Sequence, residues 1–356
     1  MDISLFDYKL PEELIAQSPT IPRDHSRLLI IDRKDGSFSH KHFYDIIDYL
    51  TPNDVVVLNK TKVFPARFFG KKKTGGKIEV LLIEEVKTGI WKALTKPGLK
   101  VGQKIIFEKV VFETAGHEEQ IVLLKTKIDK IKLLNLLEKF GHIPLPPYIH
   151  SKKSEKKLRE EYQTVYAKIT GSVAAPTAGF HFTEELLDKI KAKGVQIEYV
   201  TLHVGLGTFA PVKTKKIEDH PMHFEYFEVE PEVADRLNKA KKSGKRTVLV
   251  GTTTTRVLET LVTDKEEPCQ LDTKELRGST NLFIFPPYKY KFIDALITNF
   301  HLPKSTLLCL VSAFVSSPNT DKEFGSFEKS LMGRAYKEAV KEKYRFYSFG
   351  DACFIV

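Results

Sequence analysis

The spacing of apolar side chains divides most of the chain into strand-like and helix-like segments. Short, nearly continuous apolar runs, typical of buried strands, occur at residues 27–32, 54–58, 246–251 and 294–303. Helical spacing is clear between Thr183, a suitable N-cap residue, and Gly194, a suitable helix end. The apolar face of that segment is formed by Leu186, Leu187 and Ile190. The alternation of strands and helices predicts a mixed α/β fold.

Between residues 63 and 150 the pattern changes to that of an all-β unit. Short strand-like segments, joined by glycine-containing connections, follow one another at residues 77–86, 89–96, 104–115 and 119–127. Strands at this spacing are typical of a small barrel. A helix is predicted after them, with a buried face formed by Ile131, Leu134, Leu137 and Phe140. We therefore expect a discontinuous α/β main domain, residues 1–62 and 151–356, with an inserted β-barrel domain, residues 63–150.

The composition indicates a folded and basic protein. The chain has 356 residues, more than one core usually fills, and its 42% hydrophobic content is ample for packed cores. Lysine and arginine outnumber aspartate and glutamate by 56 to 46, which gives a net charge of +10. This excess favours encounters with polyanions such as RNA, although solvated faces of a lysine-rich protein give the same count.

Cysteine usage and the first residues bear on the cellular compartment. The cysteines are only three and widely separated, with no CxxC pair, which disfavours a disulfide framework or a structural zinc site. The first residues are acidic, unlike the basic start of a secretory signal. The longest apolar segment, residues 292–315, is interrupted by polar residues and Pro303. We therefore expect a cytoplasmic protein without a membrane span.

The stretch GTTTTR, residues 251–256, lies between a predicted strand and a predicted helix. Ligands of α/β sheets bind at such strand ends, where a helix N-terminus presents free N–H groups. Threonine hydroxyls and Arg256 could hold a carboxylate or phosphate there. The alternative is a capped helix with a surface arginine. The stretch is not a P-loop, because the GxxxxGK[ST] spacing is absent.

Several histidines also lie near predicted strand ends or turns. His203 precedes a loop with Gly205 and Gly207, which has too few glycines for the dinucleotide fingerprint. Asn299 and His301 leave a buried strand just before a proline.

Three further histidines lie in other surroundings. His220 and His223 have a spacing that suits a metal, but no third ligand is evident and a loop entering a strand explains them better. His181 follows the unusually small and neutral stretch of residues 172–180. Taken without any comparison, these residues indicate a two-domain α/β enzyme or an RNA-binding protein with a small-molecule pocket, and they identify no reaction.

Longer motifs resemble a known family. In chain order they are IPRDHSRLLIIDR, VVVLNKTKVFPARFFG, GHIPLPPYI, YQTVYAKITGSVAAPTAGFHFT, LHVGLGTF, GTTTTRVLE, DALITNFHLPKSTLLCLVSAF and YRFYSFGDACFI. Together they look like the S-adenosylmethionine:tRNA ribosyltransferase-isomerases of queuosine biosynthesis, and the resemblance runs from Phe6 to Ile355. It implies a mixed α/β domain with an inserted β-barrel, as the apolar pattern also predicts.

The resemblance also implies a reaction. The ribosyl part of S-adenosylmethionine moves onto 7-aminomethyl-7-deazaguanine at the wobble position of certain tRNAs and is isomerised, which gives epoxyqueuosine. Adenine and methionine leave. No metal or redox cofactor is implied, because S-adenosylmethionine is a consumed substrate, and the protein is expected to act as a monomer on tRNA.

Roles for particular residues follow as hypotheses from this reaction. The sulfonium acidifies the C5′ hydrogens, so a general base is needed, and His181 is the first candidate before His203, His301 and Asp24. Another of these histidines could assist the departure of adenine. Phe180 could stack on a base, and Arg256 with two threonines could hold the methionine carboxylate. The full set of expected substrate contacts is Thr177, Gly179, Phe180, Gly205, Gly207, Thr252, Thr253, Arg256 and Asn299.

Contacts to the anionic tRNA are expected from basic residues of two segments, Arg67, Lys71, Lys72, Lys73, Lys152, Lys153 and Arg159. The second segment could equally be a solvated linker. The sequence departs from the family's pattern at Thr254, Thr255, Pro287 and residues 316–320, which affects the details of those loops. A non-catalytic tRNA-binding homologue and a hydrolase or methyltransferase remain the alternative functions.

Overall fold

The computed structural model describes residues 1–205, 212–263 and 268–356, and its largest element is a nine-stranded sheet. In spatial order the strands are β17 (Arg277–Thr280), β13 (Glu225–Glu228), β12 (Gln196–Leu202), β3 (Asp54–Asn59), β14 (Arg246–Val250), β18 (Ala295–Asn299), β19 (Ala352–Ile355), β1 (Arg27–Ile31) and β2 (Phe38–His42). Strands β12, β3, β14 and β18 run parallel at its centre. Strands β3, β14 and β18 are rich in apolar residues because both of their faces are covered, whereas β12 also carries Gln196 and Glu198.

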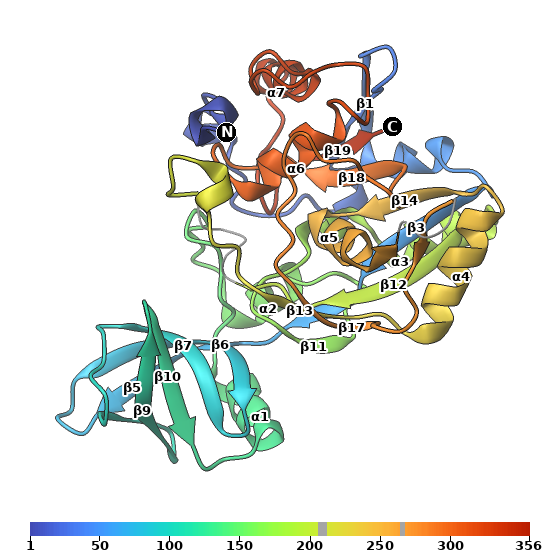
Figure 1. Cartoon of the computed structure of the whole chain (residues 1–356). Helices are drawn as coiled ribbons and strands as arrows, with labels where there is room; N and C mark the ends of the chain where they lie inside the picture. The colour runs from blue at the N-terminus through green and yellow to red at the C-terminus, as the bar shows by residue number, and fades with distance from the viewer. Residues whose placement is uncertain (206–211, 264–267) are drawn as a thin grey trace.

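Alternate side chains of the central strands enter two separate cores. Val55 and Val57 of β3 face a core built with α4 (Pro231–Lys242), α5 (Thr252–Leu261), α6 (Thr306–Phe314) and α7 (Leu331–Lys341). Val56 and Leu58 face the opposite core, which contains α3 (Glu184–Ala192) and the 3-10 helix Phe43–Tyr49. The main domain is therefore a three-layer arrangement of helices around a mixed sheet (Figure 1).

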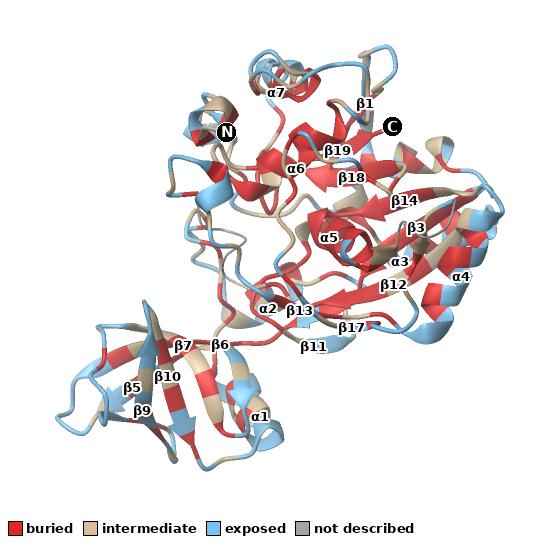
Figure 2. Cartoon of the chain, in the orientation of Figure 1, coloured by how far each residue is buried: buried red, intermediate tan, exposed pale blue. Residues whose placement is uncertain are grey.

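The inserted unit is a closed barrel that projects from the main sheet (Figure 1). Its strands, in spatial order, are β10 (Ile121–Thr126), β7 (Ile90–Lys96), β6 (Lys77–Lys87), β5 (Arg67–Lys72), β8 (Lys104–Phe107) and β9 (Val110–Glu118). The barrel strands alternate buried and exposed residues (Figure 2), whereas β3 and β18 of the main sheet are buried throughout. The α/β fold with an inserted barrel is thereby confirmed, while the domain boundaries at residues 62 and 150 stay predictions.

Helix α1 (Lys130–Phe140), which packs on the barrel, corrects one predicted face. Leu133 and Leu137 are buried, but Ile131 is 73% exposed and Phe140 is 39% exposed. Apolar residues lie on more than one side of this helix, so spacing alone could not select the side that meets the barrel. The predicted face was wrong at those two positions.

The remaining elements join the two units or close the sheet edges. They are α2 (Glu155–Glu161), the parallel pair β4 (Thr61–Val63) and β11 (Ile169–Ser172), and the hairpin β15 (Val262–Thr263) and β16 (Gln270–Leu271). Short 3-10 helices lie at Ile3–Phe6, Glu12–Leu14, Arg23–His25, Thr177–His181 (η5) and Ile217–Asp219. None of the helices in the described part of the chain has the length and apolar character needed to cross a bilayer.

Candidate active site

A pocket lies at the carboxyl ends of β14 and β18, the edge at which α/β sheets bind ligands. It is lined by Tyr148, Ala175, Pro176, Thr177, Ala178, Val204, Gly251, Thr252, Thr253, Thr298, Asn299, Phe300, His301, Leu302, Leu307, Tyr347 and Ser348. The predicted residues Thr177, Thr252, Thr253, Asn299 and His301 are brought together here. None of these lining residues is an acid, a lysine or an arginine, so the polar groups are hydroxyls, an amide and an imidazole.

The start of α5 forms one wall of the pocket. Gly251 has φ +88°, a left-handed conformation that a glycine adopts without strain, and it turns the chain from β14 into the helix. Thr252 and Thr253, in the first turn of the helix, line the pocket, and the first amides of a helix have no intrahelical partners. The buried Thr253 hydroxyl has no hydrogen-bond partner within the described residues. This wall can accept an anionic or strongly polar ligand group.

Thr254 and Thr255, which depart from the family's pattern, do not contribute to this wall. Both side chains are fully buried. Their hydroxyls donate back to the carbonyls of Val250, at 2.8 Å, and Gly251, at 3.2 Å. This i−4 hydrogen bonding satisfies both hydroxyls inside the fold.

Asn299, at the end of β18, connects the pocket to His181. Its amide donates to the Tyr347 carbonyl at 3.0 Å, and its Oδ1 is buried without a partner within the described residues. The Nδ1 of His181 lies 2.7 Å from the Ser26 hydroxyl, while its Nε2 likewise has no partner. Burial lowers the pKa of His181 to about 3, against an opposing contribution from Asn299. His181 is therefore neutral near pH 7 and lies behind Asn299 rather than among the lining residues.

His301 lies on the pocket wall itself. Its Nε2 is 2.9 Å from the Thr298 hydroxyl, and its Nδ1 has no hydrogen bond with a described residue. Burial lowers the pKa of His301 to about 3, so this imidazole is also neutral near pH 7. Two tyrosines fix its backbone. The Tyr8 hydroxyl donates to the His301 carbonyl at 2.5 Å, and the Tyr336 hydroxyl accepts from the His301 amide at 2.8 Å.

The two other predicted base candidates lie outside the pocket. His203 places Nδ1 2.9 Å from the Thr61 hydroxyl and stacks near Tyr226, and burial lowers its pKa to about 4. Asp24 accepts a hydrogen bond at 3.2 Å from Thr183, the N-cap of α3. Neither side chain reaches the lining residues of the pocket.

Gly179 and Phe180 also lie behind the wall, although both were predicted as substrate contacts. A Cβ at Gly179 would overlap the Tyr166 hydroxyl, so the glycine allows close packing of the chain. Phe180 is buried, with Tyr162 at 5.6 Å and Phe349 at 5.8 Å between ring centroids. Its ring is thus occupied by protein contacts in this structure.

Arg256 faces away from Thr252 and Thr253, towards a second pocket. Its guanidinium pairs with buried Glu225 and donates to the carbonyls of Leu282, at 3.0 Å, and Thr280, at 3.2 Å. We predicted that Arg256 and the two threonines hold one carboxylate together. The structure corrects this prediction, because the guanidinium points elsewhere and already has protein partners for its N–H groups.

The predicted glycine loop and the histidine pair adjoin the second pocket. Gly205 donates its amide to Glu225 at 2.8 Å, and Gly207 lies outside the described residues. His220 and His223 line that pocket. No group of three metal-ligating side chains occurs within residues 1–205, 212–263 and 268–356.

Sequence reasoning missed the aromatic side of the active-site pocket. Tyr148 and Tyr347 lie with ring centroids 4.8 Å apart, and the Tyr148 hydroxyl is 2.7 Å from that of Ser348. Tyr347 has φ +69°, which is uncommon for a bulky residue and typical of functional sites. Both tyrosines belong to quoted motifs, but a left-handed backbone cannot be read from the sequence.

The predicted tRNA contacts fall into two groups with different surroundings. Lys153 binds Glu161 at 2.7 Å, and Arg159 donates to the carbonyls of Glu138 and Gly141. These side chains hold α2 in place. Arg67, Lys71, Lys72 and Lys73 lie instead on β5 and the turn after it, and Lys152 is exposed.

Known proteins similar to this chain were found by sequence and by structure. The family described as queuosine biosynthesis protein matches residues 3–355. The S-adenosylmethionine:tRNA ribosyltransferase-isomerase of Sulfurihydrogenibium sp. (strain YO3AOP1) is 51% identical, and that of Thermotoga petrophila is 49% identical, with 100% of both chains covered in each case. The crystal structure of S-adenosylmethionine tRNA ribosyltransferase from Thermotoga maritima is 37% identical, with a TM-score of 0.54, and covers 99% of this chain and 100% of that chain.

Proposed function

This chain belongs to the queuosine biosynthesis protein family, and we propose that its pocket at the ends of β14 and β18 is where the ribosyl group of S-adenosylmethionine is transferred to tRNA. Membership across residues 3–355, with full-length relatives at about half identity, carries the assignment as a tRNA ribosyltransferase-isomerase. The position of the pocket at a carboxyl edge, with hydroxyl and amide donors converging on it, supports the placement of the reaction there.

The finer description of the reaction rests on the resemblance. We propose 7-aminomethyl-7-deazaguanine at the wobble position as the acceptor, epoxyqueuosine as the product, and adenine and methionine as leaving groups. S-adenosylmethionine is consumed, so no metal or redox cofactor enters the proposal. We also retain a cytoplasmic monomer as the working form.

His301 is our candidate for the general base. It lines the pocket, and a tautomer that donates from Nε2 to Thr298 leaves the Nδ1 lone pair free to accept a proton from C5′. His181 lies behind Asn299, so we assign it the role of positioning that amide. The low pKa of both imidazoles keeps them unprotonated at neutral pH, and the assignment of His301 as the base rests on its position in the pocket rather than on its base strength.

Neither histidine is charged near pH 7 before the reaction, so an imidazolium that can assist adenine forms only when His301 accepts the C5′ proton. The other available donors are hydroxyls and amides of the wall, among them Thr177, Thr253 and Ser348. Tyr148 and Tyr347 offer the aromatic surface that was expected from Phe180. The amino end of α5, with Thr252 and Thr253, is our candidate for the methionine carboxylate.

One incubation tests the proposed function. Purified protein is mixed with labelled S-adenosylmethionine and tRNA that carries the aminomethyl base, and release of adenine is followed. We expect adenine release that depends on the tRNA. Its absence would contradict the proposed reaction and leave a non-catalytic tRNA-binding homologue. Formation of S-adenosylhomocysteine would indicate methyl transfer instead.

A further inference from the structure

The outer face of the barrel carries large apolar side chains in contact with solvent. On β5, Phe69 is 53% exposed and lies on the same face as Lys71, two residues further along the strand. Lys71 is directly opposite Ile106 of β8, and Ile106 is opposite Val111 of β9. The two aliphatic side chains are 40% and 48% exposed. We call these four residues the Phe69 face.

The surroundings of Phe69 are those of a ring that can stack on another ring. The Arg67 guanidinium carbon lies 5.8 Å from the ring centroid, and the His142 ring lies at 5.5 Å with an interplanar angle of 65°. These neighbours contact its edge and one side, while more than half of its surface stays open. Glu79 lies opposite Phe69 on β6 and pairs with Arg67 at 3.7 Å, so the uncompensated positive charge near the ring comes from the lysines further along the hairpin. An exposed aromatic beside such lysines is the usual platform for an unpaired base.

The charge of this surface fits a polyanion. Lys71, Lys72, Lys73 and Lys77 lie on the β5–β6 hairpin and form no ion pair with a described residue. Lys104, by contrast, pairs with Glu113 at 3.1 Å on the neighbouring strands. The hairpin lysines are therefore uncompensated within the described residues, and they can contact phosphates without breaking an ion pair of the fold.

The Phe69 face is also close to the proposed active site along the chain. His142, which packs on Phe69, and Tyr148, which lines the pocket, are separated by an extended, proline-rich segment. Their Cα atoms can be no more than about 22 Å apart, the fully extended length of six residues. A tRNA loop with one base in the pocket can thus reach the barrel with its neighbouring nucleotides.

From these observations we infer that the Phe69 face binds single-stranded tRNA next to the reacting nucleotide. An unpaired base stacks on Phe69, and its flanking phosphates contact Lys71 and the other hairpin lysines. The inference rests on the proposed function, because it takes tRNA as the partner. It adds a stacking site that does not take part in the chemistry and that contributes affinity for tRNA.

The test separates stacking from charge. Binding of the full-length protein to a tRNA transcript is measured over a range of salt concentrations for Phe69→Ala, Phe69→Tyr and Lys71→Ala. Loss of one stacking contact should weaken binding about 5- to 100-fold for Phe69→Ala without changing the salt dependence. Phe69→Tyr should bind like the wild type. Lys71→Ala should make the dependence of log K on log salt less steep, by roughly 0.7 to 0.9 in the magnitude of the slope.

Ile131→Ala is the matched control, because Ile131 is 73% exposed on the same inserted unit but lies on α1. It should bind tRNA normally. Wild-type binding by Phe69→Ala, or a loss that Phe69→Tyr does not restore, overturns the inference. So does a change in oligomeric state on Phe69→Ala with tRNA binding intact, which would make the face a contact between copies. Adenine release by the wild type is measured in parallel, so that failure of the proposed function is seen separately.

Discussion

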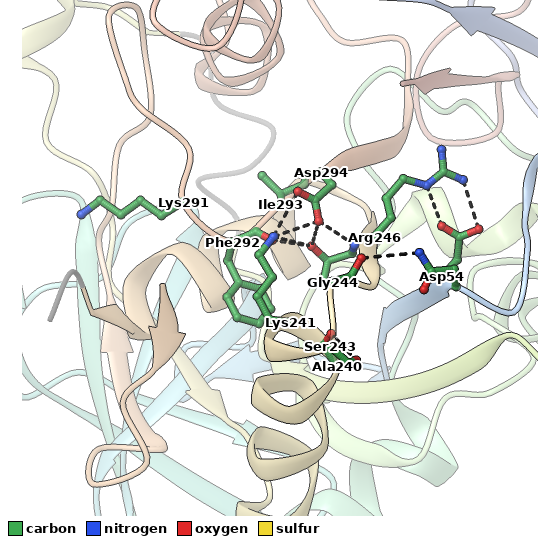
Figure 3. Close-up of polar contacts among 12 residues, drawn as sticks. Asp54, Ala240, Lys241, Ser243, Gly244, Arg246, Lys291, Phe292, Ile293 and Asp294 are labelled. Carbon is green, nitrogen blue, oxygen red and sulfur yellow. Dashed lines mark hydrogen bonds and ion pairs between the residues drawn. The ribbon is translucent and has the colours of Figure 1, made fainter. Parts of the chain in front are cut away.

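Buried polar groups are paired differently at the two ends of the central strands, which we call the amino edge and the pocket edge of the sheet. At the amino ends of β3, β14 and β18, charged side chains pair with one another (Figure 3). Asp54 accepts from Arg246 at 2.6 Å, and Asp294 accepts from Lys241 at 2.8 Å and from the Thr247 amide at 2.7 Å. Each of these groups has a partner, and the lysine also donates to the Phe292 carbonyl (Figure 3).

At the carboxyl ends of the same strands, the lining of the pocket is uncharged and its polar groups are incompletely paired. The Thr253 hydroxyl is buried without a hydrogen bond to a described residue, and among those residues Asn299 Oδ1 has no hydrogen-bonding neighbour other than the His181 imidazole that lies behind it. Leaving such atoms unpaired costs free energy in the unliganded protein. Saturated polar groups therefore mark the edge that holds the strands together, and unsatisfied ones mark the edge that receives a ligand.

The largest expected effect is on turnover at the pocket edge. His301→Ala should lower the rate of tRNA-dependent adenine release about 10²- to 10⁴-fold, because the proposed base is removed. The rate is measured at saturating substrates. His203→Ala is the matched control, since that imidazole contacts Thr61 outside the pocket, and it should change the rate by only a few-fold. An equal loss of rate in the two variants would contradict the assignment of His301, rather than His203, as the general base.

At the amino edge the main loss should be in stability. Asp54→Ala leaves the Arg246 guanidinium without its carboxylate and should lower the free energy of unfolding by about 3 kcal/mol. Urea denaturation measures this change. The folded variant should release adenine at the wild-type rate, because Asp54 lies at the far end of β3 from the pocket. A large fall in turnover with unchanged stability would contradict the structural role of this edge.

Much of this contrast could be predicted from the sequence. Continuous apolar runs located the central strands, because both faces of the sheet are covered, and the motif GTTTTR located one wall of the pocket. Asn299 and His301 were recognised because polar residues follow an apolar strand just before a proline. Each of these patterns involves residues that are close in sequence, so it can be recognised without knowledge of the tertiary structure.

What failed depended on contacts between distant segments. Arg256 looked like a ligand group, but Glu225 and two carbonyls far along the chain satisfy it. Phe180 looked available and is enclosed by other rings, while Tyr148 and Tyr347, 199 positions apart, form the aromatic wall instead. The face of α1 was misjudged for the same reason, since only the barrel decides which of its apolar sides is buried.

The two buried histidines predict a dependence of stability on pH that arises at the pocket edge. Their pKa values in the folded protein, about 3, lie below the unfolded value of 6.5, so the unfolded chain takes up protons first as the pH falls. Above about pH 6.5 they contribute no pH dependence. Between that pH and about pH 3 the free energy of unfolding should fall by up to about 1.4 kcal/mol per pH unit for each histidine.

Urea denaturation at a series of pH values checks this prediction. His301→Gln should remove the contribution of one histidine and flatten the curve in the acid range. Replacement of the exposed His150 should leave the shape of the curve unchanged. An equally steep curve for His301→Gln would show that the acid sensitivity arises elsewhere in the fold.

The smallest expected effect concerns the aromatic wall of the pocket. It compares an aromatic side chain at the carboxyl ends of the strands, Tyr347, with one at the amino ends, Phe292. Tyr347→Ala removes a surface on which a nucleobase can stack and should raise KM for S-adenosylmethionine about tenfold, whereas Tyr347→Phe, which keeps the ring, should leave KM nearly unchanged. Phe292→Leu at the amino edge should lower stability without changing KM. The left-handed backbone at Tyr347 costs about 1 kcal/mol, and the protein keeps it where the ring meets the pocket. An unchanged KM for Tyr347→Ala would mean that the left-handed backbone positions this ring for packing and not for substrate binding. The two ends of the strands would then differ only in the unpaired polar atoms at the pocket.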